Sequence, residues 1–178
     1  MREGRVRPPR AIRVRENAGC PLGHESERTI KQNKSNLKDI SANVRAARSI
    51  WGPLPHLVLK HLRELTKRHQ LSVIAGDITL LGSQFYVTHR GLLRIGERNH
   101  CSGIVTRLQK NLSDPTTGRW VFRATVFKSL RSRGFVGYGD ADPSNVSPLV
   151  RGAEMRVAET RAVNRALRKA YGIGLCSV

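Results

Sequence analysis

Residues 147–172, S-P-L-V-R-G-A-E-M-R-V-A-E-T-R-A-V-N-R-A-L-R-K-A-Y-G, constrain the fold more than any other stretch. They predict one long helix, with Ser147 as its N-cap and Pro148 at the first helical position. At about 100° per residue, one arc of the helix holds four basic residues, Arg161, Arg165, Arg168 and Lys169. The opposite side carries small or apolar residues suited to close packing on a sheet, namely Met155, Ala162, Val163, Ala166, Leu167 and Ala170.

The basic row of this helix is unbalanced. Arg161, Arg165 and Lys169 stand at i, i+4 and i+8 without an acidic residue in the row, and like charges at that spacing cost roughly 0.2–0.5 kcal/mol per pair. We expect a polyanion to offset the repulsion; a solvated basic face is the alternative. The whole chain has 32 Lys and Arg against 13 Asp and Glu, a net charge of +19, which predicts a nucleic-acid partner.

The sequence before the helix predicts an antiparallel β-meander. Strand-like runs at 103–112 and 119–128 are joined by the turn-rich residues 113–118. Within 120–127 the alternation predicts one apolar and one mixed face. Phe135, Val136 and Tyr138 predict a third, buried strand, after which the glycines predict a turn. The expected core is therefore β-β-β-α.

The remaining residues predict helices and a short hairpin. Apolar spacing indicates helices over 37–50 and 54–69, short β runs over 71–74, 78–81 and 85–87, and a short helix over 89–97. Residues 1–36, with seven arginines and no apolar period, predict a disordered basic arm. We therefore expect an α+β domain over 37–178, with an antiparallel hairpin or meander packed on the long C-terminal helix.

Several segments together resemble a known family. They are F-Y-V-T-H-R-G-L-L-R-I-G-E-R-N, the hairpin, F-V-G-Y-G and A-V-N-R-A-L-R-K-A-Y-G, and they span about residues 84–174. Their order and spacing resemble the single-strand annealing family typified by the eukaryotic recombination mediator Rad fifty-two. The phage annealing proteins of the Red beta and ERF types are related alternatives.

The resemblance implies an oligomeric ring that binds single-stranded DNA by its backbone and anneals complementary strands without ATP, in homologous recombination and DNA repair. By position, the family's paired basic residues fall on Arg168 and Lys169, or on Arg165 and Arg168 in a register shifted by one turn. The family's strand tyrosine falls on Tyr86, but an arginine that usually precedes it meets Gly76. The chain stops at Val178, so a recombinase-binding tail is not expected in it.

The full set of expected DNA-binding residues is Arg161, Arg165, Arg168, Lys169, Tyr86, Lys128, Arg131 and Arg133. Tyr86 or Tyr138 could stack on a base, although an isolated strand tyrosine is more often core. We expect no catalytic residue, no cofactor and no metal, since Cys20 and His24 find no second ligand pair at zinc spacing. The apolar helices at 37–50 and 54–69 also predict a homo-oligomer, and a recombinase or single-strand-binding protein is a further candidate partner.

Two other functions compete with annealing. G-Y-G-D-A-D before a helix could be a nucleotide loop or an acidic metal site of an enzyme, but the glycine fingerprint is incomplete and a tight turn with positive φ explains it. A basic RNA- or ribosome-binding module would share the charge and the meander but be monomeric and lack annealing activity. The absence of a long apolar run or signal predicts no membrane contact and a cytoplasmic, nucleoid-associated protein.

Overall fold

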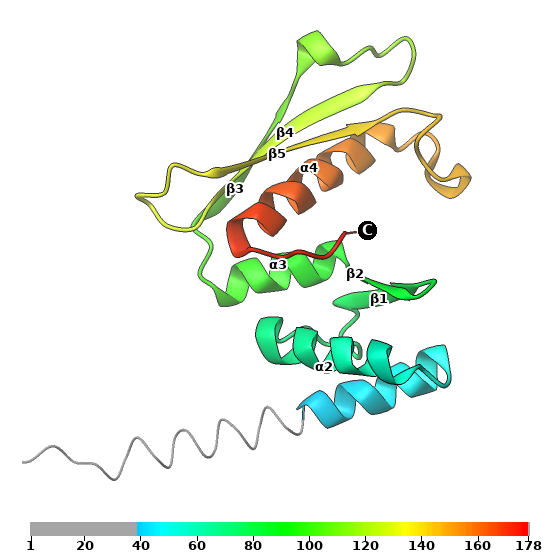
Figure 1. Cartoon of the computed structure of the whole chain (residues 1–178). Coiled ribbons are helices and arrows are strands. Elements are labelled where there is room, and N and C mark those ends of the chain that lie inside the picture. Colours follow the sequence, from blue (N-terminus) through cyan, green and yellow to red (C-terminus); the bar gives the residue numbers. More distant parts are fainter. Residues whose placement is uncertain (1–38, 178) are drawn as a thin grey trace, which may run out of the picture. The chain divides into compact units, whose positions relative to one another are not determined.

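The structure is a computed structural model that describes residues 39–177. It confirms the α+β fold, in which a three-stranded antiparallel meander packs on a long C-terminal helix (Figure 1). The basic arm predicted over residues 1–36 lies outside the described residues. The elements in chain order are a helix over 39–51, α2 (His56–His69), β1 (Ile78–Leu81), β2 (Gln84–Val87), α3 (His89–Arg98), β3 (Gly103–Leu108), β4 (Trp120–Phe127), β5 (Phe135–Ala141) and α4 (Glu154–Tyr171).

The two N-terminal helices form where apolar residues recur at helical spacing. The helix predicted over 54–69 is confirmed as α2, and the one predicted over 37–50 is confirmed for its described part. Ala47 on the first helix and Leu62 and Leu65 on α2 are buried in the shared core. Because this apolar stripe is covered within the chain, less of it is left for other copies than the sequence suggested.

The run at 71–74 was predicted as a strand, and this prediction is wrong, because these residues lead into a turn before β1. Their backbone is held by the buried side chain of Asn43. Its Nδ2 donates to the Leu71 carbonyl at 2.8 Å and its Oδ1 accepts from the Val73 amide at 3.0 Å. The side-chain amide of Asn43 thus supplies the hydrogen bonds that a neighbouring strand would otherwise give to these two backbone groups.

The short hairpin and the helix after it are confirmed. β1 pairs antiparallel with β2, and Thr88 then caps α3 by accepting from the Gly91 amide at 3.1 Å. A Cβ on Gly91 would collide with the Asp77 backbone, so α3 lies directly against the residue that precedes β1. Asp77 is fully buried and pairs with Arg94 on α3 at 3.0 Å.

The meander has the strand order β3-β4-β5, with both pairings antiparallel. In β4 the predicted alternation is confirmed, since Phe122, Ala124 and Val126 are buried and Arg123 and Thr125 are half-exposed. One face of the sheet thus meets α4, whereas on the other face Val121, near the start of β4, is also buried. β3 and β5 are the edges of this sheet.

α4 packs on β5 where β5 carries glycine. A Cβ on Gly139 would collide with the backbone of Ala158 and Ala162, and one on Gly137 would collide with Ala162 and Ala166. Neither glycine has a positive φ, so the tight turn predicted for G-Y-G-D-A-D is wrong. These glycines are strand residues that let two backbones approach closely.

The buried strand predicted through Phe135, Val136 and Tyr138 is correct in place but wrong in orientation. Gly137, Gly139 and Ala141 are buried against α4, and Val136 and Tyr138 therefore point to the opposite face because side chains alternate along a strand. Phe135 falls on the α4 face, but at the exposed end of the strand. Tyr138 is 47% exposed. Small residues, and not the larger apolar ones, form the buried face of this strand.

The start of the long helix also differs from the prediction. Ser147 does accept a hydrogen bond, from the Leu149 amide, and Pro148 does begin a helical turn, but this turn is the separate 3₁₀ helix η2 (Pro148–Val150). α4 begins only at Glu154. Met155, expected on the packing side, lies in the first turn and is 45% exposed.

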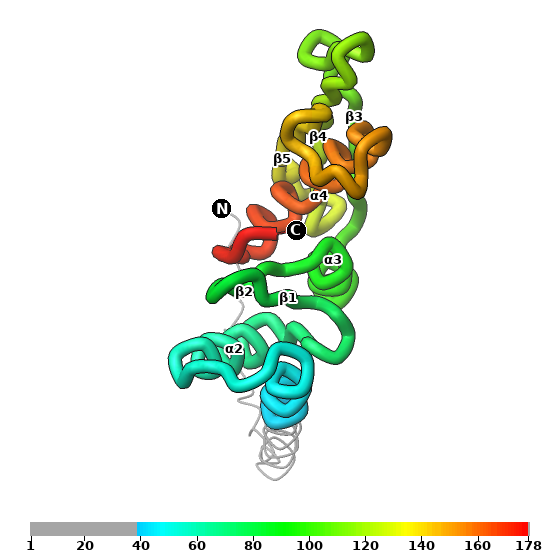
Figure 2. Tube along the Cα trace, turned by 90° about the vertical axis from the view of Figure 1, so that its right-hand side faces the viewer, coloured from blue at the N-terminus to red at the C-terminus, as the bar shows by residue number. Residues whose placement is uncertain are grey.

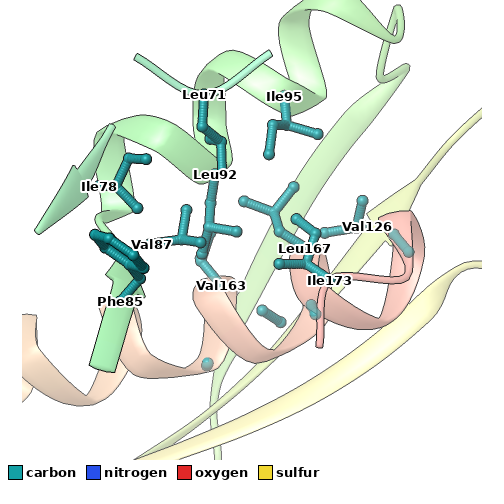
Figure 3. Close-up of a cluster of buried hydrophobic side chains, with 14 of the residues drawn as sticks. Leu71, Ile78, Phe85, Val87, Leu92, Ile95, Val126, Val163, Leu167 and Ile173 are labelled. Carbon is teal, nitrogen blue, oxygen red and sulfur yellow. The ribbon is translucent and has the colours of Figure 1, made fainter. Parts of the chain in front are cut away.

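A hydrophobic core joins α3, α4 and the hairpin (Figure 3). Val163 and Leu167 on α4 point toward Leu92 and Ile95 on α3, and Val87 on β2 closes the cluster. The residues after α4 return to β2, where the Val87 amide donates to the Cys176 carbonyl at 3.0 Å. This return places the C-terminal segment beside α4.

Candidate functional site

Three basic side chains of α4 lie along the outer edge of β5. Each donates a hydrogen bond to one of three alternate carbonyls of this strand. The pairs are Lys169 with Val136 at 2.8 Å, Arg165 with Tyr138 at 2.7 Å and Arg161 with Asp140 at 2.7 Å. Four helical residues rise about 6 Å and two strand residues about 6.8 Å, so the i, i+4, i+8 row matches every second carbonyl.

This row closes the β5 edge. β5 is the last strand of the sheet, and the carbonyls that the row contacts point away from β4. The partial negative charges of these oxygens offset the repulsion among the three basic side chains. From the sequence, a bound polyanion was expected to do this. The Arg165–Asp140 contact at 3.7 Å adds little, because both side chains are about half exposed.

Removing the row should open the β5 edge. We expect a double variant, Arg165→Ala with Lys169→Ala, to self-associate more than the wild-type chain, because unpaired strand edges recruit other strands. Sedimentation velocity over a concentration series measures this. Arg156→Ala is the matched control, since Arg156 lies on α4 without contacting β5. Equal association of both variants and wild type would show that the row does not protect the edge.

A groove of about 910 Å³ runs beside the row, and we call it the α4 groove. Its walls are η2 and the C-terminal segment at Cys176 and Ser177, and its floor is α4. A smaller hollow of about 370 Å³ shares Arg165 and Arg168 with it and adds Lys169. Figure 2 shows the chain from the side, with the C-terminal segment and α4 both in view.

Among residues 39–177, only basic residues supply ionised side chains to the α4 groove and its extension. They are Arg156, Arg161, Arg165, Arg168 and Lys169, and no Asp or Glu of this range lines either hollow. The floor is fixed by Asn164, which is buried and whose Oδ1 accepts from His89 Nδ1 at 2.6 Å. This contact ties α4 to the first residue of α3. The groove is thus a cationic channel on a rigid base.

Two of these arginines differ from the edge row. Among residues 39–177, no carboxylate or carbonyl accepts a hydrogen bond from the guanidinium of Arg156 or Arg168. The Nε of Arg168 is buried without a hydrogen-bond partner in this part of the chain. The two residues are twelve positions apart, about 18 Å along the helix. Their charges are therefore available to a bound anion.

The structure separates the predicted site residues into groups. It brings Arg161, Arg165, Arg168 and Lys169 together at the groove, as expected. Arg156 was missed, because a helical wheel places it about 140° from Arg161 and only η2 and the C-terminal segment make it part of the same groove. Sequence periodicity cannot predict that two segments distant in sequence form the walls of a groove on α4.

The other predicted residues lie elsewhere. Lys128 follows β4 and its Nζ lies 5.4 Å from the centre of the Tyr171 ring, at the end of α4. Burial raises the pKa of the Tyr171 hydroxyl to about 12, so the ring stays neutral beside this cation. Arg131 and Arg133 are exposed in the connection between β4 and β5.

Tyr86 is half-buried on β2, opposite Thr79 of β1. It does not line the α4 groove. Tyr138, for which a core position was the more common alternative, is exposed on the sheet face that turns away from α4. The two tyrosines considered for base stacking therefore lie outside the groove.

None of the family models, curated proteins and solved structures compared with the chain matches it. The resemblance to the annealing family therefore stays a prediction. Among residues 39–177, no three His, Cys, Asp or Glu side chains gather as a metal site. The helices in this range are too short or too polar to cross a membrane.

Proposed function

We propose that this chain binds single-stranded DNA by its backbone in the α4 groove and anneals complementary strands. The observation that carries the proposal is the charge of the groove and its extension, which five basic residues line and to which no Asp or Glu of the described residues contributes. Arg156 and Arg168 have no acceptor in the described part of the chain, so that their binding to phosphate would not require a protein contact to break. Phosphate contacts position a strand without reading its sequence.

The lining of the groove also favours backbone binding over base stacking. No Phe, Tyr or Trp lines it or its extension in the described chain, and aromatic side chains are the usual platforms for single-stranded bases. Bases held outside the groove would stay free to pair. This is the requirement for annealing, which makes and breaks no covalent bond.

The proposal includes the roles that the resemblance implies. Annealing would proceed without ATP or metal, in recombination and repair, with the chain as a homo-oligomer of ring type in the cytoplasm, at the nucleoid. A recombinase or single-strand-binding protein is the candidate protein partner. Since Arg161, Arg165 and Lys169 close the β5 edge, a ring would have to form through surfaces other than continuation of the sheet at β5.

Fluorescence anisotropy tests the proposed binding. We expect tight binding to oligonucleotides of contrasting sequence at low salt, with log Kd changing linearly with log salt, because phosphate contacts release counterions. In a strand-pairing assay the protein should accelerate annealing without ATP or metal. Salt-insensitive affinity, a strong preference for one short motif, or binding without faster pairing would contradict the proposal.

A basic RNA-binding module is the second candidate, and one observation favours it. The sheet face that turns away from α4 exposes Tyr138 directly opposite Arg123, which in turn pairs with Arg107. Exposed aromatic and basic residues on a sheet are a common platform for single-stranded RNA bases. If Tyr138→Ala weakens RNA binding while the chain never accelerates DNA pairing, this alternative is supported.

A further inference from the structure

The two edges of the meander differ. The β5 edge is closed by the basic row of α4, as described above. At the other edge, the Gln109 amide donates to the Val121 carbonyl of β4 at 2.8 Å. Because backbone groups alternate in direction along an antiparallel strand, Ile104, Thr106 and Leu108 direct their amides and carbonyls away from β4.

The β3 edge is open in the described part of the chain. No hydrogen bond from residues 39–177 outside β3 reaches the outward backbone groups of Ile104, Thr106 or Leu108. α4 lies over the glycines of β5 and reaches β3 through Glu159, whose carboxylate accepts from the Thr106 hydroxyl at 2.7 Å. Ile104 is 36% exposed and Val105 45% exposed. Unpaired backbone and exposed apolar side chains therefore occur on the same strand.

We propose that β3 pairs with β3 of a second copy of this chain, antiparallel and about a two-fold axis at Thr106. With β5 closed in both copies, β3 is the edge at which their meanders can join. The result is a continuous six-stranded sheet, with one α4 helix near each end of the same face. This inference is independent of the proposed function, since the pairing needs no nucleic acid.

The register follows from the side chains. With Thr106 opposite Thr106 of the second copy, Ile104 lies opposite Leu108, and apolar side chains meet on the α4 face. On the other face Arg107 lies opposite Val105, so no two arginines face each other across the new strand pair. A register centred on Arg107 would place like charges directly opposite, which is destabilising. The strand G-I-V-T-R-L is thus self-complementary about Thr106.

Cysteine cross-linking tests the pairing and its register. In a background with Ser at Cys20, Cys101 and Cys176, Thr106→Cys should give a covalent dimer under mild oxidation. Directly opposite residues in a hydrogen-bonded pair have Cα atoms about 5.5 Å apart, within disulfide range. A mixture of Ile104→Cys and Leu108→Cys chains should cross-link, whereas each alone should not. The background without an added cysteine is the control.

The mass in solution gives a second, independent measurement. Light scattering should give at least twice the 19.9 kDa of one chain, and Ile104→Lys should lower this mass, because an edge lysine opposes strand pairing. Leu112→Lys is the matched control, since Leu112 is also exposed but lies outside β3. Circular dichroism checks that each variant folds.

Two outcomes would overturn the proposal. One is a wild-type chain that remains monomeric across the concentration series and gives no Thr106→Cys dimer. The other is cross-linking of Ile104→Cys or Leu108→Cys alone at the level of the mixture, which would mean that β3 does not pair in this register. A dimer that Ile104→Lys leaves intact would place the interface elsewhere.

Discussion

Gly139→Ala should unfold much of this protein. The added Cβ would lie against the backbone of Ala158 and Ala162 on α4. Neither the helix backbone nor the strand backbone can move to make room without lifting α4 from β5. Overpacking of a well-packed core costs typically 1–3 kcal/mol, and we expect the upper end, about 3 kcal/mol or more, because the obstacle is backbone. Chemical denaturation of the variant beside wild type measures this change in the free energy of unfolding.

Gly103→Ala is the matched control. It also lies in the meander, has no positive φ, and its Cβ would meet no atom within 4 Å. Its stability should stay close to wild type, or increase slightly because alanine loses less conformational entropy on folding. If both variants lose the same stability, close packing of α4 on the β5 glycines is not what holds the two elements together.

Arg156→Ala combined with Arg168→Ala should remove most strand annealing. Neither guanidinium bonds to protein in the described part of the chain, so truncation removes cations without opening the β5 edge. Hydrogen bonds to charged groups contribute about 1.5–3 kcal/mol each, so the loss of two should raise Kd for single-stranded DNA at least about a hundredfold. The salt slope should fall by about 1.4, since each phosphate contact contributes about 0.7.

Arg131→Ala combined with Arg133→Ala is the charge-matched control. It removes the same two charges from an exposed connection that does not line the groove. If the control loses as much annealing as the groove variant, net charge rather than the groove governs binding. If the groove variant keeps the salt slope of wild type, Arg156 and Arg168 do not contact phosphate. Unchanged melting temperatures would show that both variants keep the fold.

The sequence predicted elements whose signal is local. The helices at 54–69 and 89–97 and the strands of the meander follow from apolar spacing and turn residues, which act over one or two turns of chain. The long helix was located correctly, but its start was not. A serine followed by proline favours any helical turn, so that signal could not separate η2 from α4.

The candidate site was predictable in part. Helical periodicity alone put Arg161, Arg165, Arg168 and Lys169 on one arc, and the α4 groove and its extension together contain all four. Periodicity could not tell that three of them bind strand carbonyls and the fourth, Arg168, does not. It could not find Arg156 either, because the wall that recruits it comes from segments distant in sequence.

The sequence by itself determined the β-β-β-α order, the cationic helix and the excess of positive charge, because these depend on residue types and short spacings. Only the tertiary structure decided which groups the basic side chains contact and what the glycines pack against. Gly137 and Gly139 look like turn residues in the sequence, yet they are strand residues on which a helix packs. The basic row is likewise matched by β5 carbonyls, since the rise of four helical residues is close to that of two strand residues. Such matches depend on which elements meet in space.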